Sequence, residues 1–381
     1  MKLRTSLLVL ATLLLGACSR EAAAPAGTAA TPGAASTGPE EKVLNIYNWS
    51  DYIGEDTIAN FEKETGIKVT YDVFDSNSLL ETKLMSGNTG YDLVVPSLQY
   101  LSRQVKAGVF QPLDKSLLKN TGNLDPVIMA RIATLDPGNA HAINWLWGTT
   151  GIGYNAAKVT AALGEGAPVD SWSIVFKPEY LSKLKGCGVA VLDAPDEMIP
   201  IALNYLGEDP NSTDPAVIEK AGALLATVRP YITEFNSSEY INELANGDIC
   251  LAVGWSGDIG QAAARAEEAK NGVEVKFNIP KEGAPMWFDM IAIPKDAKHP
   301  KNAHLFLDYI MRPDVMAGIS NAVQYANANK ASTPLVDKEV LDNPNVYPPK
   351  PVMDKLFTFA VLPPDVDRQY TRLWTKLKTG K

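Results

Sequence analysis

The fold is decided by residues 43–74, which read VLNIYNWSDYIGEDTIANFEKETGIKVTYDVF. Residues 43–49 and 67–74 have the apolar and β-branched character of strands, whereas the apolar spacing of residues 55–65 predicts a helix. Gly66 stands where this helix is expected to end, because glycine readily adopts the left-handed backbone of a helix C-cap. The stretch therefore predicts a β-α-β unit.

The same alternation continues along the chain. A helix is expected from about Leu79, where Ser78 and Glu81 have capping-box spacing, and a buried strand at 91–95 ends before Pro96. Further on, strands are expected at 188–192, 248–253 and 290–293, and a helix at 215–228. Alternating strands and helices predict an open, mostly parallel sheet with helices on both faces.

The length of the folded part predicts two α/β lobes, because about 340 residues exceed what one hydrophobic core usually organises. We place the first lobe at residues 43–148 plus about 285–325, and the second at 149–284 plus about 326–381.

The N-terminus has the pattern of a secreted lipoprotein. Lys2 and Arg4 precede an apolar run at 7–15, which is shorter than the ~20 residues of a membrane-spanning helix, and Leu-Gly-Ala-Cys18 follows. We interpret residues 1–18 as a signal peptide ending in a lipobox with lipid on Cys18; an ordinary secretory signal is the alternative. Residues 19–42 lack core-forming side chains and predict a flexible tether.

Charge and cysteines narrow the class of protein. Loss of Lys2 and Arg4 with the signal leaves 33 basic against 44 acidic side chains, a net charge of −11, which disfavours nucleic acid as a partner. Apart from Cys18, the chain has Cys187 and Cys250. In an oxidising periplasm two thiols suggest one disulfide, with two buried free thiols as the alternative.

Aromatic and acidic residues recur at the predicted strand ends, where ligands of such sheets bind. They are Trp49, Ser50, Asp51 and Tyr52 after the first strand, Ser97 after the third, Asp193 and Glu197 after 188–192, Trp255 and Asp258 after 248–253, and Trp287 and Asp289 beside 290–293. An aromatic face attracts a cation by ~0.5–2 kcal/mol, and a carboxylate accepts charge-assisted hydrogen bonds. Any one of these residues could be packing or a helix cap, but together they predict a box for an organic ammonium.

Catalytic interpretations fit less well. Residues 254–258, GWSGD, lack the second glycine spacing of a nucleophile elbow, and of His141, His299 and His304 the last two lie in sequence expected to be exposed. Residues 148–153, GTTGIG, have no following lysine and match neither a P-loop nor a dinucleotide fingerprint, so we interpret them as a flexible connection between the lobes.

The residue types also bear on metal and sugar chemistry. The three scattered histidines and unclustered cysteines offer no visible zinc or iron ligand set. A glycosidase with a carboxylate pair is compatible with the residue types, although a sugar has little use for so many negative groups. We therefore expect no enzyme activity, cofactor or metal.

Several blocks of the chain resemble the periplasmic polyamine-binding proteins of ABC importers. They are NIYNWSDYI at 45–53, GTTGIGYN at 148–155, LNYLG at 203–207, LANGDIC at 244–250 and YANANK at 325–330. The resemblance extends over essentially the whole mature chain. It implies a monomeric two-lobed periplasmic binding protein that closes over putrescine or spermidine in the cleft between the lobes and delivers it to a membrane permease.

The resemblance also implies roles for individual residues. Aromatic walls fall on Trp49, Tyr52, Trp255, Trp287 and Tyr325, ammonium acceptors on Asp51, Glu197, Asp258 and Asp289, hydroxyl groups on Ser50 and Ser97, and a disulfide on Cys187 and Cys250. One position departs from the pattern. Diamine-binding members tend to carry Phe where this chain has Trp287, and spermidine binders tend to carry Trp, so ligand length stays open. A sensor that presents the same pocket to a membrane kinase or cyclase is a further alternative.

Overall fold

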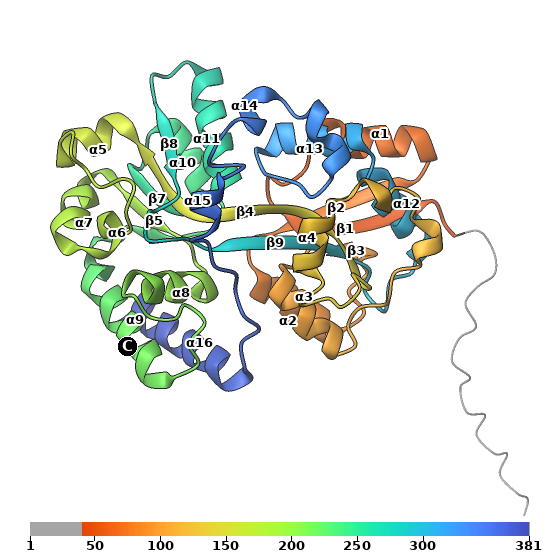
Figure 1. Ribbon diagram of the computed structural model, residues 1–381, viewed down its shortest axis with the longest axis horizontal. Coiled ribbons are helices and arrows are strands. Elements are labelled where there is room, and N and C mark those ends of the chain that lie inside the picture. The colour runs from red at the N-terminus through yellow and green to blue at the C-terminus, as the bar shows by residue number, and fades with distance from the viewer. Residues whose placement is uncertain (1–39, 381) are drawn as a thin grey trace, which may run out of the picture. The chain divides into compact units, whose positions relative to one another are not determined.

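The computed structural model describes residues 40–380, which belong to one compact unit. The signal peptide, Cys18 and the tether up to residue 39 lie outside the described residues. One sheet with the strand order β2-β1-β3-β9-β4-β7-β5-β6 runs through this unit, and β8 pairs with β4 beside it (Figure 1). The predicted α/β fold with helices around a central sheet is confirmed.

Two hydrophobic cores divide the elements into two lobes. We call the elements around the first core the first lobe: β1 (Val43–Trp49), α1 (Glu55–Thr65), β2 (Lys68–Phe74), α2 (Asn77–Ser86), β3 (Leu93–Val94), α3 (Leu98–Lys106), α4 (Pro126–Ile132), α12 (Pro300–Ile310) and α13 (Pro313–Val323). We call those around the second core the second lobe: α5 (Ala156–Leu163), α6 (Ser173–Phe176), α7 (Pro178–Leu184), β5 (Val189–Val191), α8 (Pro195–Tyr205), α9 (Pro215–Val228), β6 (Glu234–Phe235), α10 (Tyr240–Asn246), β7 (Leu251–Trp255), α11 (Ser256–Ala269), β8 (Val275–Asn278) and α16 (Pro364–Thr379).

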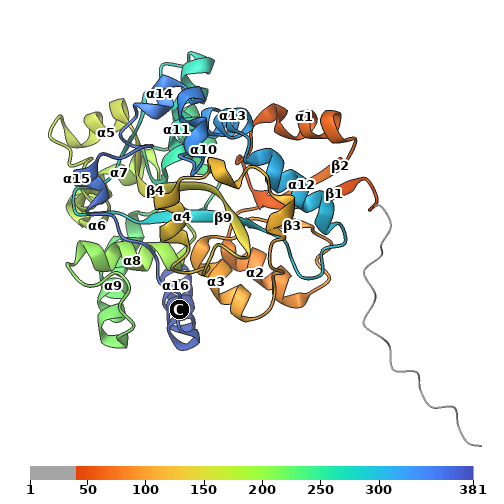
Figure 2. The same cartoon turned by 45° about the vertical axis from the view of Figure 1, so that its right-hand side comes forward.

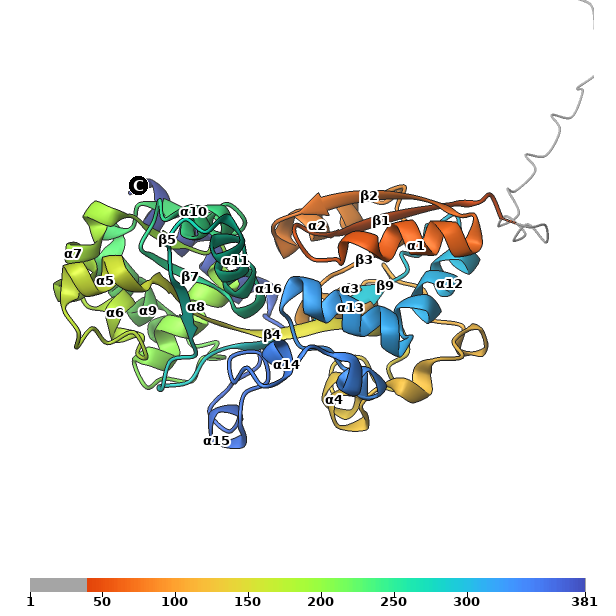
Figure 3. The same ribbon diagram turned by 90° about the horizontal axis from the view of Figure 1, so that it is seen from above.

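Two strands cross from one lobe to the other. They are β4 (Ala142–Asn155) and β9 (Met286–Ala292), which pair antiparallel and lie side by side in Figures 1 and 2, and Figure 3 shows β4 running between the lobes. The pairings of β1 with β2 and β3, and of β5 with β6 and β7, are parallel, as expected for β-α-β units. The crossing strands therefore join two parallel sheets through antiparallel pairs.

The predicted connection at residues 148–153 does join the lobes, but it is a strand. It lies within β4, every residue of which is buried, and it pairs with β9 and then with β7 and β8. Its glycines allow close packing: a Cβ on Gly151 would lie 2.5 Å from the Phe277 ring. The small residues at 148–153 are therefore explained by close packing around β4.

The first β-α-β unit matches its prediction, and Gly66 has the left-handed φ of 71° that ends α1. The expected capping box of the next helix is wrong. The helix begins at Asn77, because the Ser76 side chain accepts a hydrogen bond from the Leu79 backbone N–H at 3.3 Å, while Glu81 pairs with Arg103.

Three other predictions from the sequence are wrong. β7 begins at Leu251 instead of 248, because the backbone N–H of Asp248 is used to close the end of α10 on the Glu243 carbonyl. β9 begins at Met286, so Trp287 lies in the strand and not beside it. His299 and His304 are buried, at 8% and 4% exposure, and not exposed as expected.

The lobe boundaries stay a prediction, but packing differs from them in one segment. Residues 326–346 were placed in the second lobe, whereas Ala326, Val336, Val340 and Val346 belong to the first core. The short helix α14 (Lys338–Leu341) lies within this segment, and α15 (Lys350–Met353) follows it before α16 returns to the second core.

Cys187 and Cys250 are joined by a disulfide, as the resemblance implied. It ties the turn before β5 to the start of β7 in the second lobe. Across residues 40–380, none of the helices combines the length and the apolar character needed to cross a bilayer.

Candidate functional site

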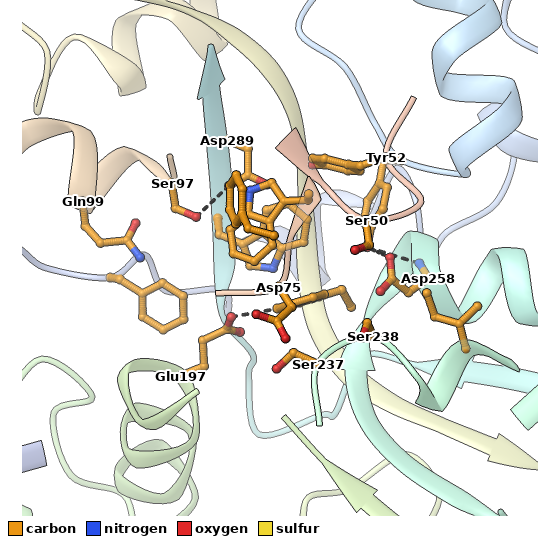
Figure 4. A pocket seen from close by; sticks show the side chains of 17 residues that line it. Ser50, Tyr52, Asp75, Ser97, Gln99, Glu197, Ser237, Ser238, Asp258 and Asp289 are labelled. Atoms are coloured by element: carbon orange, nitrogen blue, oxygen red, sulfur yellow. Dashed lines mark hydrogen bonds between the residues drawn. The ribbon is translucent and has the colours of Figure 1, made fainter. Parts of the chain in front are cut away.

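A cavity lies where elements of both lobes and the crossing strand β9 converge (Figure 4). Its lining consists of Trp49, Ser50, Tyr52, Phe74, Asp75, Ser97, Gln99, Glu197, Ser237, Ser238, Ile241, Trp255, Asp258, Trp287, Asp289, Tyr325 and Phe359.

The first-lobe wall is built at the carboxyl ends of β1 and β3. Trp49 is the last residue of β1, and its indole N–H donates to the Val95 carbonyl at 2.9 Å, which fixes the ring. Ser97 follows β3 and donates from its hydroxyl to Asp289 Oδ1 at 2.7 Å (Figure 4). Asn77 in turn donates to the Ser97 hydroxyl at 2.9 Å, so the Asp289 carboxylate is held by a chain of polar contacts.

Glu197 lies in the first turn of α8 and projects into the cavity from the second lobe. Its Oε1 accepts from the Trp255 indole N–H at 3.0 Å, and its Oε2 accepts from the Thr150 hydroxyl at 2.5 Å. Trp287 also donates to this hydroxyl, at 3.2 Å. Thr150 of β4 thus fixes one carboxylate and one aromatic ring at once.

Asp258 lies in the first turn of α11 and is held by two phenols. Its Oδ1 accepts from the Tyr325 hydroxyl at 2.6 Å and its Oδ2 from the Tyr240 hydroxyl at 2.7 Å. The Tyr325 ring approaches α11 over Gly257, where a Cβ would lie 2.3 Å from a ring atom. The glycine of the GWSGD block therefore makes room for an aromatic wall.

The aromatic rings that line the cavity form two groups of contacting rings. Trp49 contacts Phe74 at 4.7 Å and Trp255 at 5.5 Å between ring centroids, and the latter contact joins the two lobes. Tyr325 contacts Tyr52 at 5.1 Å and Trp287 at 5.4 Å, both edge to face. Such rings offer negative faces to a cation and apolar area to an alkyl chain.

The three buried carboxylates have perturbed pKa values. Burial raises the pKa of Glu197 to about 8, with the neighbouring Asp196 contributing, and raises the pKa of Asp258 and of Asp289 to about 7. Hydrogen bonds from Tyr325 and Tyr240 oppose the shift at Asp258, and the hydrogen bond from Ser97 opposes it at Asp289. An ammonium group in the cavity would favour the ionised forms, so this geometry is suited to an organic cation.

The sequence matches a known family over most of its length. Residues 56–348 match the bacterial extracellular solute-binding proteins. The chain belongs to this family.

Individual relatives of this solute-binding protein are close. The putrescine-binding periplasmic protein PotF of Escherichia coli is 61% identical over 343 residues, 90% of this chain and 93% of that protein. The putrescine-binding periplasmic protein SpuD of Pseudomonas aeruginosa is 56% identical over 342 residues, again 90% and 93%. The structure of a putative spermidine/putrescine ABC transporter protein from Listeria monocytogenes aligns with a TM-score of 0.80 at 33% identity, covering 89% of this chain and 100% of that one.

The cavity of this solute-binding protein brings together ten of the eleven residues selected from the sequence: Trp49, Ser50, Tyr52, Ser97, Glu197, Trp255, Asp258, Trp287, Asp289 and Tyr325. Asp51 is the exception. Its backbone has a left-handed φ of 52°, and its Oδ1 accepts from Arg265 of α11 at 2.6 Å, outside the cavity. Asp51 is therefore a partner of Arg265 and not a lining carboxylate.

The sequence reasoning missed part of the lining: Phe74, Asp75, Gln99, Ser237, Ser238, Ile241 and Phe359. Phe74 and Asp75 end and follow the predicted strand at 67–74, so the strand-end rule could have found them. Phe359 comes from an irregular segment before α16 and carried no signal. Asp193, also considered at a strand end, instead accepts from the Trp374 indole at 2.7 Å and anchors α16.

Within residues 40–380, His, Cys, Asp and Glu form no group of three or more suited to a metal.

Proposed function

We propose that this protein is the substrate-binding subunit of a polyamine ABC importer, which captures putrescine and, less tightly, spermidine in the cavity. The observation that carries the proposal is the convergence of three buried carboxylates, Glu197, Asp258 and Asp289, with an aromatic wall in one cavity. Buried carboxylates without a cationic partner are costly, and a linear polyamine supplies the missing charges and an alkyl chain for the rings.

The cavity sets the ligand class by charge and shape. Each carboxylate already accepts hydrogen bonds from the chain's own hydroxyl or indole groups, which orient its oxygens before the ligand arrives. Such preorganisation lowers the entropy lost on binding. A neutral sugar or an anionic solute would leave the carboxylates uncompensated. Relatives named as putrescine-binding periplasmic proteins support the same ligand class for this chain.

The proposal includes binding without chemical turnover, a periplasmic location and a monomer anchored by lipid on Cys18. A membrane permease would be the partner that receives the ligand. The anchor can be tested separately: the protein should incorporate radiolabelled palmitate in cells and partition with membranes. A Cys18→Ser variant should be released in soluble form, and unchanged membrane partitioning would contradict the anchor.

Calorimetric titration with putrescine, cadaverine, spermidine and spermine tests the ligand class. We expect at least one linear polyamine to bind in the micromolar range or tighter. A matched control is Asp72→Asn, which removes one exposed carboxylate of β2 outside the cavity and should leave binding unchanged. The absence of heat with all four polyamines would refute the proposal. Uptake by vesicles containing the cognate permease would distinguish a transport receptor from a sensor.

A further inference from the structure

A fourth carboxylate of the cavity, Asp75, differs from the other three in its surroundings. It is the only exposed residue among those that line the cavity, whereas Glu197, Asp258 and Asp289 are buried. Asp75 therefore marks the mouth of the cavity. Figure 4 shows it among the lining side chains.

Asp75 is also free of partners from the described chain. Each buried carboxylate accepts at least one hydrogen bond from a serine, threonine, tyrosine or tryptophan side chain. Within residues 40–380, Asp75 has neither a side-chain hydrogen bond nor an ion pair. Its acceptor oxygens are thus available to a ligand group at the mouth.

The backbone at Asp75 is fixed by the sheet. Phe74 pairs with Trp49 in the register of β1 and β2, and the Ser50 backbone N–H donates to the Phe74 carbonyl at 3.2 Å. The Phe74 ring packs on the Trp49 ring, which itself lines the cavity. These contacts fix the backbone at Asp75 beside the aromatic wall.

We propose that Asp75 determines specificity for chain length by accepting the terminal ammonium of a triamine that extends to the mouth. The inference rests on the proposed function. A diamine has two ammonium groups, which the three buried carboxylates can accommodate inside. Spermidine carries a third ammonium at the end of a longer chain, and Asp75 offers an unpaired acceptor for it. The contact is exposed, so its contribution is that of a surface ion pair.

Asp75 could also have a structural role at the N-terminus of α2, besides the proposed role in ligand specificity. Asp75 precedes Ser76, the N-cap of α2, and a negative charge near a helix N-terminus stabilises the helix. Loss of that effect would lower the melting temperature and disturb both ligands alike. It would not change the ratio of spermidine to putrescine affinity, which is the quantity that tests the proposal.

The experiment is a competition titration of spermidine against putrescine with wild type, Asp75→Asn and the control Asp72→Asn. Asp72 lies on β2, the strand that Asp75 follows, is exposed and carries the same charge, but does not line the cavity. We expect Asp75→Asn to lower the spermidine-to-putrescine affinity ratio by about three- to five-fold at low salt, the upper range of an exposed ion pair. The reduction should shrink at high salt.

The possible results distinguish the role of Asp75 from the proposed function of the protein. A ratio in Asp75→Asn equal to that of wild type, an equal loss in Asp72→Asn, or a wild type that binds putrescine but not spermidine would overturn the inference. Failure of the wild type to bind any polyamine would instead overturn the proposed function. Asp75→Lys provides a second variant: it places a like charge at the mouth and should lower the ratio further than Asp75→Asn does.

Discussion

Polyamine binding should release protons from the cavity carboxylates. At pH 7, a pKa of about 7 leaves Asp258 and Asp289 each about half protonated, and a pKa of about 8 leaves Glu197 about nine-tenths protonated. An ammonium close to each carboxylate favours ionisation, while the amines of the ligand, like the lysine amine with its pKa of ~10.4, stay protonated. Binding should therefore release up to about two protons per ligand at pH 7.

Calorimetry in buffers of different ionisation enthalpy measures this number as the slope of observed heat against buffer ionisation enthalpy. The slope should fall towards zero at pH 9, where the carboxylates are already ionised. Glu197→Gln should lower the slope at pH 7 by about one proton, because the amide cannot titrate. Asp72→Asn should leave the slope unchanged. A slope of zero at pH 7 with measurable binding would refute the reasoning.

The raised pKa values of the three buried carboxyl groups also make the stability of the ligand-free protein fall as the pH rises. Between the ordinary carboxyl pKa of ~4 and pH 8, the folded chain holds more protons on these groups than the unfolded chain does. Their contribution to the free energy of unfolding is thus present at low pH and lost as the pH rises through about 7 to 8. Glu197→Gln should flatten the fall in melting temperature between pH 5 and pH 8, and an unchanged pH profile would contradict the assignment.

Four further outcomes are expected. Asp258→Ala or Asp289→Ala should each weaken polyamine binding by at least ~1.5 kcal/mol in calorimetry, because a charged hydrogen bond is lost; wild-type affinity would show that the acceptors are misassigned. Putrescine should bind the wild type, and the binding free energy of spermidine should lie within ~2.8 kcal/mol of that of putrescine. Trp287→Phe should shift the preference towards putrescine in competition titration, since a smaller ring covers less alkyl chain. An unchanged affinity ratio would exclude Trp287 as a specificity residue. Replacing Cys187 and Cys250 by serine should lower the free energy of unfolding in urea by ~4 kcal/mol, because the disulfide closes a loop between residues 63 positions apart; a loss below ~1 kcal/mol would contradict this. Solution scattering should show that the protein becomes more compact when ligand binds, and its melting temperature should rise with ligand concentration. Unchanged scattering with confirmed binding would contradict closure of the two lobes over the ligand.

Much of the site follows from local sequence. Trp49 and Trp255 end strands, Ser97 lies three residues after β3, and Glu197 and Asp258 lie in the first turns of helices that follow strands. In a β-α-β arrangement, strand ends meet at one edge of the sheet, so these positions were predictable without coordinates. Tyr325 follows helix α13, and only the family resemblance pointed to it.

Tertiary structure decided the rest, because neighbouring side chains at a strand end face different surroundings. Asp51 satisfies the same local rule as Ser50, yet its left-handed backbone and the Arg265 guanidinium from the other lobe hold its carboxylate outside the cavity. Asp75 was overlooked although it also follows a strand. The start of β9 depends on pairing with β4, which is distant in sequence. Sequence determined which residues gather at the strand ends, and the packing of the two lobes decided which of them face the ligand cavity.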